Sequence, residues 1–201
     1  SSDVCSSDLL TGSLRNFSLR DWLDALDATS SKSKKSFFAV PVKVAMDNVH
    51  LAKAKDLKPR KPSDPRELPT FEGEIAYFEY DTFPYGKYTF KTVKEKGGLN
   101  LEKFTITSPY VEATGKAYWH YHPKKQSTEV TMNVKSKNYG ELLTSLGFAS
   151  IIENGDASFS GDFNWKGGFG DFEWGILNGV VTMDISNGVF TKVDPGAGRL
   201  L

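Results

Sequence analysis

The chain has 201 residues, of which 39 % are hydrophobic, 13 % aromatic and 25 % charged, the composition of a globular protein and not of a disordered one. Lysine plus arginine equals aspartate plus glutamate, at 25 each, so no excess of positive charge predicts binding to nucleic acid. The sequence contains no run of about 18 apolar residues that could span a membrane, and it shows no signal-peptide pattern.

The first nine residues are expected to lie outside the fold. Residues 1–9, SSDVCSSDL, are polar, lack periodicity and contain Cys5, the single cysteine of the chain. They resemble a translated sequencing-adapter tail, and a natural disordered end is the alternative. Without them the chain has no cysteine, which suits an oxidising compartment.

The next segment, residues 10–69, is predicted to hold a helix, two short strands and a proline-rich connector. Leucine and tryptophan recur at spacings of three and four in residues 19–28, which is typical of a short amphipathic helix. Residues 37–57 predict two short strands around Pro41, a position that favours a sheet edge. Four prolines in residues 58–69 exclude regular structure there and predict an extended connector.

From residue 70 to residue 201 the sequence predicts a long antiparallel sheet. Apolar and polar residues alternate along short segments, which indicates strands with one apolar and one solvated face. Short connections, among them FPYG at residues 83–86 and NG at residues 187–188, are expected to be turns that make neighbouring strands antiparallel. Helical spacing of leucines in residues 138–147 predicts one short helix between two strands. The expected fold class is therefore mainly β: a long antiparallel meander with two short helices.

The apolar positions of these strands are the candidate functional surface. They mix aliphatic with aromatic side chains on one face of the predicted sheet. They are Val111, Ala113, Ala117, Trp119, Val130, Met132, Val134, Phe159, Phe163, Trp165, Val181, Met183 and Ile185. A sheet with one apolar face must hide that face against a second sheet, by closing into a barrel, or against an apolar ligand. The residue types suit a protein core and a lipid-facing surface equally well.

The sequence offers no set of residues for catalysis, metal binding or a cofactor. His120 and His122 share one side of a strand at a spacing that metal sites use, but His50 is distant in sequence, so a solvated face is favoured. The Gly-Ala-Gly at residues 196–198 lacks the lysine of a phosphate-binding loop, and no G-x-S-x-G nucleophile elbow occurs. We therefore expect a protein that is not an enzyme.

Four stretches of the chain resemble the C-terminal part of the YhdP branch of AsmA-like bacterial envelope proteins. The carrying stretches are LPTFEGEIAYFEYDTFPYGKYTFKTV (68–93), LNLEKFTITSPYVEATGKAYW (99–119), NYGELLTSLGFASIIENGDASFSGDFNWKG (138–167) and LNGVVTMDISNGVFTKVDPGAGRLL (177–201). The last is the most specific, because it combines a glycine-containing strand, an NG pair and a V-x-PGAGRLL ending. The resemblance runs from about residue 49 to residue 201.

The resemblance implies a sheet curled into a groove whose apolar inside holds the acyl chains of phospholipid. It implies a β-rich body in the periplasm of a Gram-negative bacterium, tethered to the inner membrane by a segment absent from this chain, and acting in lipid transport between the inner and outer membranes. The thirteen apolar residues would then contact lipid. The family chain continues beyond the PGAGRLL turn, so this sequence is expected to be a fragment. Partners other than phospholipid and the membrane are not specified.

Two other functions remain open at this point. One is a structural or assembly factor of the cell envelope whose sheet edges pair with another chain, with the apolar face an ordinary core. The other is a hydrolase or a sugar-binding sheet, which would expose Trp119, Tyr121 and Trp165 on a flat face with polar neighbours. Two of these three aromatic residues share faces with valine and alanine.

Overall fold

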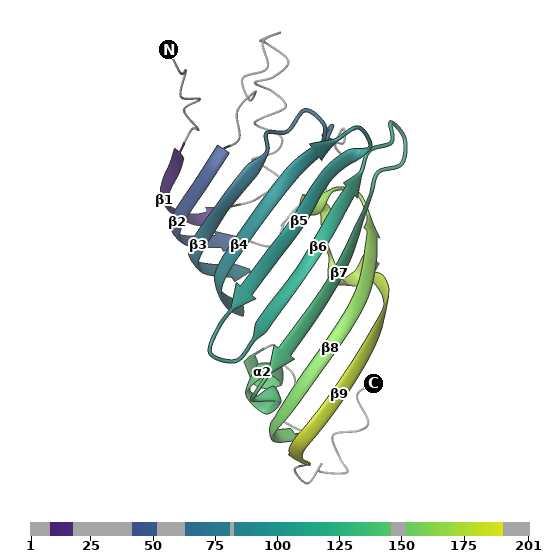
Figure 1. Cartoon of the computed structure of the whole chain (residues 1–201). Coiled ribbons are helices and arrows are strands. Elements are labelled where there is room, and N and C mark those ends of the chain that lie inside the picture. Colours follow the sequence, from purple (N-terminus) through teal and green to yellow (C-terminus); the bar gives the residue numbers. More distant parts are fainter. Residues whose placement is uncertain (1–8, 18–41, 52–62, 81–82, 146–151, 191–201) are drawn as a thin grey trace, which may run out of the picture.

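The computed structural model shows a single nine-stranded sheet in which the strands follow one another in sequence order (Figure 1). The structure describes residues 9–17, 42–51, 63–80, 83–145 and 152–190, and the fold is given for these residues. The predicted helix at 19–28 and residues 1–8 of the predicted tail lie outside them, whereas Leu9, which was predicted to belong to the tail, is the first residue of a strand.

The strands are β1 (Leu9–Phe17), β2 (Val42–Leu51), β3 (Phe71–Tyr80), β4 (Phe83–Glu95), β5 (Gly98–Thr107), β6 (Glu112–His120), β7 (Ser127–Ser136), β8 (Ile152–Lys166) and β9 (Asn178–Phe190). The helix α2 (Tyr139–Ser145) lies between β7 and β8, and two short 3-10 turns, η1 (Phe169–Asp171) and η2 (Trp174–Ile176), lie between β8 and β9.

The strands from β3 to β9 form an antiparallel meander, which confirms the prediction from short connections. The first two pairings, β1 with β2 and β2 with β3, are parallel. Parallel neighbours need a crossover of a dozen or more residues, and the connecting segments 18–41 and 52–70 have that length. The strands of the first third of the chain therefore extend the same sheet.

The predicted helix between β7 and β8 is confirmed. The side-chain oxygen of Asn138 accepts a hydrogen bond from the Glu141 amide at 3.2 Å, which caps the first turn as the sequence suggests. Leu142 is buried, so the apolar side of the helix faces the sheet. The predicted end of the helix at Gly147 lies outside the described residues.

The predicted turn at residues 83–86 is wrong, because these residues form the beginning of β4. Phe83 already pairs with Tyr80, and the register shifts where Gly86 faces Phe78. Gly86 has φ +84°, and a Cβ there would clash with the carbonyl oxygen of Thr107. Turns and bulges both use residues with a left-handed backbone. The residues that favour a turn here therefore form a β-bulge within a continuous strand.

The predicted turn at residues 187–188 is wrong for the same reason. β9 continues through this pair and still faces β8, with Val189 opposite Glu153. Asn187 has φ +58°, a conformation that asparagine adopts more readily than most residues. The strand is therefore one long element.

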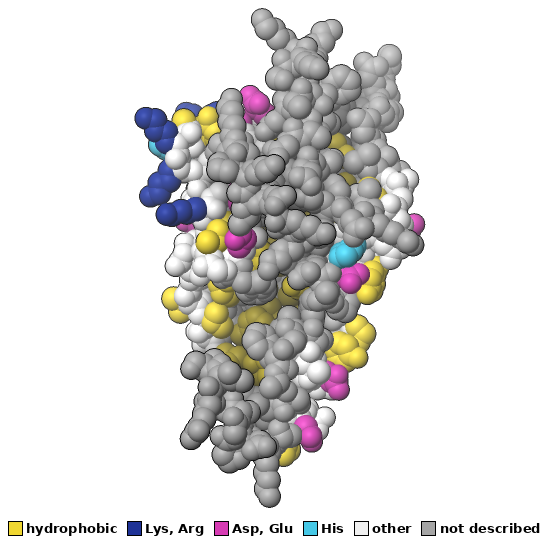
Figure 2. Space-filling model, turned by 180° about the vertical axis from the view of Figure 1, so that it is seen from behind, with side chains coloured by type: hydrophobic (Ala, Val, Ile, Leu, Met, Phe, Trp, Pro, Cys, Tyr) yellow, Lys and Arg dark blue, Asp and Glu magenta, His cyan; other side chains and the backbone are white. Residues whose placement is uncertain are grey.

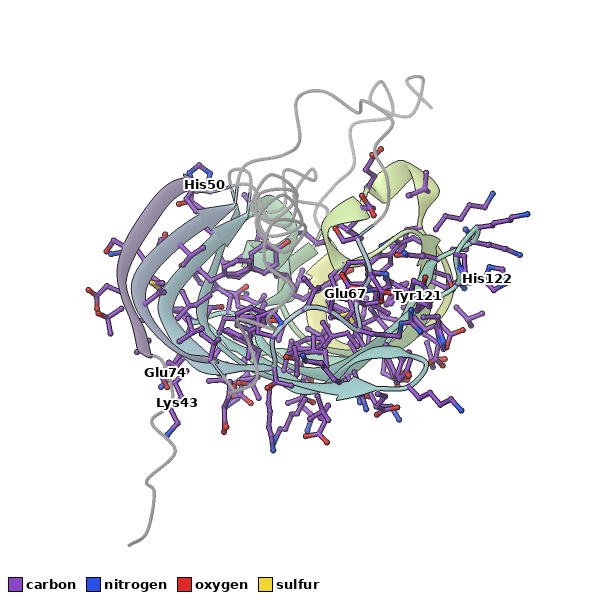
Figure 3. The ribbon with its side chains drawn as sticks, turned by 90° about the horizontal axis from the view of Figure 1, so that it is seen from above. Lys43, His50, Glu67, Glu74, Tyr121 and His122 are labelled. Carbon is purple, nitrogen blue, oxygen red and sulfur yellow. The ribbon has the colours of Figure 1, made fainter. Side chains whose placement is uncertain are left out.

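The sheet curls, so that one face is concave (Figure 3). Lys43 and Glu74 point away from the hollow, on the convex side. The two ends of the strand order, β1 and β9, do not pair with each other, so the sheet is open. This confirms the expected groove; we call its concave side the inner face and its convex side the outer face.

A substitution at Gly86 tests the bulge. Gly86→Ala adds a side chain where φ is positive and the Thr107 carbonyl is too close, so we expect it to lower the free energy of unfolding by about 2 kcal/mol. Urea unfolding measures the change. Gly175→Ala is the control, because a Cβ at Gly175 meets nothing within 4 Å. Equal stability of the two variants would contradict the bulge.

Candidate functional site

The apolar side chains of the inner face lie in rows that pass from strand to strand. Register places the residues of each row opposite one another, so the rows continue across the sheet without a break. The first row is Val44, Gly73, Phe90, Phe104, Gly115, Met132, Gly161 and Val181. The second row is Met46, Ile75, Tyr88, Ile106, Ala113, Val134, Phe159 and Met183.

Glycines in the first row make room for aromatic rings. A Cβ on Gly115 would lie 2.5 Å from the ring of Phe104, and one on Gly161 would lie 2.6 Å from the ring of Phe163. The rings therefore spread over neighbouring glycines instead of standing straight up from the sheet. This explains why large and very small residues alternate on the same face.

Twelve of the thirteen predicted site residues lie on strands and share the inner face, by register and alternation. Val111 is the exception, since it lies in the loop before β6, where its amide and carbonyl bond to Ser108. The structure thus brings the predicted set together. Their exposure differs and divides them into a covered and an open part.

The small and central members of the set are packed within the sheet. Ala113, Ala117 and Val134 are buried on β6 and β7. The residues further along the rows are less covered. We call these half-buried or exposed residues of β7, β8 and β9 the open strip: Val130, Met132, Phe159, Phe163, Val181, Met183 and Ile185.

The open strip is most exposed on β9. Val181, Met183 and Ile185 keep 51 %, 49 % and 40 % of their surface accessible. Hydrophobic side chains are also visible when the molecule is seen from behind, with lysine and arginine gathered at one margin (Figure 2). An exposed row of large apolar side chains is typical of a surface that binds another apolar body.

One end of the inner face is covered by the chain itself. Trp119 is 1 % exposed and packs with Leu68 and Leu99, while Phe169 lies 5.6 Å away, ring to ring. We call the covering segments, residues 63–70 and 167–172, the end cap. Trp119 and Trp165 belong to this packed end and not to the open strip.

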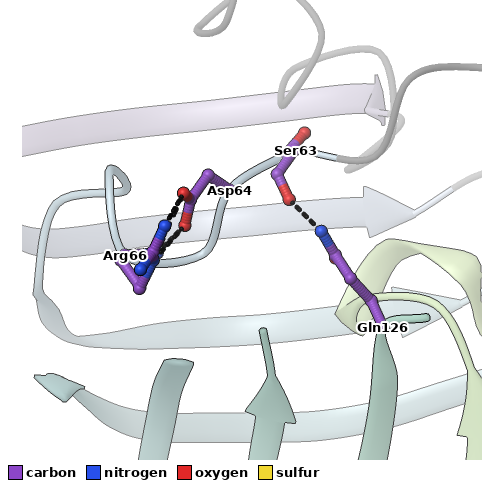
Figure 4. A network of polar contacts seen from close by, with 4 residues as sticks. All are labelled: Ser63, Asp64, Arg66 and Gln126. Atoms are coloured by element: carbon purple, nitrogen blue, oxygen red, sulfur yellow. Dashed lines mark hydrogen bonds and ion pairs between the residues drawn. The ribbon is translucent and has the colours of Figure 1, made fainter. Parts of the chain in front are cut away.

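The end cap is fastened by hydrogen bonds to buried side chains. Gln126 accepts a bond from the indole nitrogen of Trp119 at 2.7 Å and donates one to the carbonyl oxygen of Ser63 at 2.8 Å (Figure 4). The indole of Trp165 donates to the carbonyl oxygen of Gly168 at 2.9 Å. Buried indole N–H groups need such partners: Trp165 bonds directly to a cap segment, and Trp119 is linked to one through Gln126.

An ion pair between Asp64 and Arg66 stabilises the turn in residues 63–70 of the end cap. Asp64 accepts hydrogen bonds from the Arg66 side chain at 2.6 and 2.9 Å, and the Arg66 guanidinium lies 3.7 Å above the ring of Tyr121. Burial raises the pKa of the Asp64 carboxyl, but the hydrogen bonds from Arg66 outweigh it and lower the pKa below 3.8. The described part of the proline-rich connector thus lacks regular structure, as predicted, but it forms a hydrogen-bonded turn and is not extended as expected.

The helix α2 covers the other end of the inner face. The hydroxyl of Tyr139 donates to the sulfur of Met183 at 3.6 Å, so α2 lies on the inner side of β9. The open strip therefore lies between two covers, the end cap at one end and α2 at the other.

The outer face is polar, as the alternation predicts. Lys87 pairs with Glu74 at 2.8 Å, and Thr131 donates to Asp162 at 2.7 Å. His120 lies 3.1 Å from a Glu129 carboxylate oxygen. Within the described ranges, no three histidine, cysteine or acidic residues gather where they could hold a metal ion.

An open, curled sheet with a partly exposed apolar strip on its concave side defines a groove-forming β protein. The family described as YhdP protein matches residues 12–201, and the chain belongs to this family. It is therefore a YhdP-type bacterial envelope protein. No curated protein and no solved structure matches it. Of the helices in the described part of the chain, none has the length and apolar character needed to cross a membrane.

Removing the Gln126 side chain tests the end cap. Gln126→Ala leaves the Trp119 indole and the Ser63 carbonyl buried without partners, so we expect the free energy of unfolding to fall by about 3 kcal/mol. Asn100→Ala removes an exposed hydrogen bond to Glu95 and should change it by less than about 0.5 kcal/mol. Urea unfolding followed by tryptophan fluorescence compares them; equal losses would mean that the cap is not fastened through Gln126.

Proposed function

We propose that this protein carries phospholipid between the inner and outer membranes, with acyl chains shielded by the inner face. The observation that carries the proposal is the open strip, in which Val181, Met183 and Ile185 stay exposed on an open sheet. A folded protein that completes its own core would cover such residues. Membership of a bacterial envelope family supports an apolar ligand drawn from membranes.

The proposed mechanism is passive and non-catalytic. Each acyl methylene that leaves water for the inner face contributes roughly 0.8 kcal/mol, so one chain is a strong ligand without any polar contact. The charged lipid head stays in water, since the sheet leaves one side of the hollow open. Aliphatic contacts have no directional preference, which lets a chain slide along the strip.

We further propose that the chain works in the periplasm, anchored to the inner membrane through a segment outside this sequence. The support is its family and the lack of cysteine after residue 5.

A second candidate is an envelope assembly factor that pairs with another chain through β9. In the described sheet β9 pairs with β8 alone, and its 13 residues contain one charge, Asp184, and no proline or lysine. Val180 is 73 % exposed on its outer side. Edge strands that avoid pairing with other chains usually carry several charges, lysine or proline. β9 has only one charge and neither lysine nor proline, so it is suited to strand addition.

Two neighbouring substitutions on β9 separate these functions. Val181→Asp places a charge on the inner face, and Val180→Asp places one on the outer face of the same strand. Both side chains are more than half exposed, so neither variant should unfold the sheet. For a lipid carrier we expect Val181→Asp to lower phospholipid binding at least about tenfold and Val180→Asp to leave it nearly unchanged.

Binding is measured by native mass spectrometry after incubation with vesicles of phosphatidylethanolamine and phosphatidylglycerol, with thermal unfolding as a check on folding. Wild-type protein that takes up no phospholipid would reject the carrier function. A protein that acts by strand addition would instead lose its partner in both variants, because both charges flank the same backbone edge.

A further inference from the structure

The hydroxyl groups on the inner face mostly have partners in the structure. Thr92 accepts a hydrogen bond from the Phe71 amide at 2.7 Å, and Thr128 donates to the carbonyl oxygen of Gly167 at 2.9 Å. Ser136 accepts a bond from the Asn138 amide at 3.3 Å. These groups are engaged by the sheet, α2 or the end cap and are not available to a ligand.

Tyr88 differs, because its hydroxyl has no hydrogen-bond partner among the described residues. Tyr88 lies on β4 in the second inner row, between Ile75 and Ile106. Its ring stacks on Phe78 at 5.2 Å and on Phe90 at 5.4 Å, measured between ring centroids.

The surroundings of Tyr88 are otherwise apolar. Phe104 adds a third ring at 6.3 Å, and burial raises the pKa of the Tyr88 phenol, with no charged group or hydrogen bond contributing. The side chain is half-buried, so part of its surface stays accessible to solvent. Among the described residues, the inner face thus holds a phenol without a hydrogen-bond partner, within an aromatic cluster.

A lipid bound in the groove changes the hydrogen bonding of the Tyr88 hydroxyl. Acyl chains that cover the inner face displace the water, and a phenol left without a partner opposes binding. Hydrocarbon offers no acceptor. The ester carbonyl at the beginning of an acyl chain is an acceptor, and it lies next to the methylenes that the apolar surface binds.

We propose that Tyr88 donates a hydrogen bond to an ester oxygen of a diacyl lipid on the inner face, and so fixes the depth at which the lipid sits. Tyr88 is then a specificity residue for ester-linked lipids. The proposal rests on the lipid-carrying function above and adds to it the chemical class of the ligand and its position.

The dimensions of the sheet fit this position. From β4 to β9 there are five strand spacings of about 4.8 Å, or about 24 Å along the curved sheet. One leaflet of a bilayer has hydrocarbon about 15 Å thick, half of the roughly 30 Å core. An acyl chain whose ester lies at Tyr88 therefore spans about three strand spacings and reaches β7, where the open strip begins.

The test compares two lipids that differ only in the ester. The full chain is titrated with dioleoyl phosphatidylethanolamine and with its dialkyl ether analogue, and affinity is read from displacement of a fluorescent fatty-acid probe. We expect the wild-type protein to prefer the ester lipid by about three- to tenfold, the effect of one hydrogen bond in an apolar site. Tyr88→Phe should abolish this preference by weakening binding of the ester lipid, with the affinity for the ether lipid unchanged or increased.

Tyr77→Phe is the matched control, because Tyr77 is exposed on the neighbouring strand β3. It should keep the ester preference. If Tyr88→Phe keeps the preference, or the wild-type protein binds both lipids equally, the role of Tyr88 is overturned while the carrier function stands. If the wild-type protein binds neither lipid, both proposals fail.

Discussion

The structure depends on one constraint: a sheet with a continuous apolar face that does not close on itself has to cover that face with something. A barrel would remove the problem by pairing β1 with β9, but the strand order leaves these two apart. The chain meets the constraint only in part. The end cap covers the tryptophan end, α2 covers the opposite end, and the open strip lies between them.

The packing of the covered end and the openness of the strip have the same origin in side-chain size. Glycines such as Gly115 and Gly161 let aromatic rings lie flat across the sheet, which gives a smooth, shallow surface. At the covered end, Trp119 is large enough to reach the cap segments and has an N–H that ties them down through Gln126. The open strip consists of aromatic rings and aliphatic or thioether side chains, so it binds through apolar contact area.

The proposed lipid transport and the proposed role of Tyr88 fit together as two parts of one binding surface. The open strip offers contacts that tolerate sliding, and the aromatic cluster around Tyr88 offers a single directional contact. Membership of the YhdP family fixes the protein as an envelope component, and phospholipid is its proposed cargo.

The sequence by itself determined the sheet from β3 onward, its antiparallel order and the face on which the apolar residues lie, because alternation is a local property read two residues at a time. It did not predict β1 (Leu9–Phe17). It could not separate bulges from turns at Gly86 and Asn187, since both use the same left-handed backbone and differ only in whether a partner strand continues alongside. Nor could it predict that Trp119 is buried and Met183 exposed, because both are large apolar residues on the same face of the sheet. Only the tertiary structure decided that the cap segments bury the first and leave the second exposed, because burial depends on contacts between residues as far apart in the chain as Ser63 and Gln126.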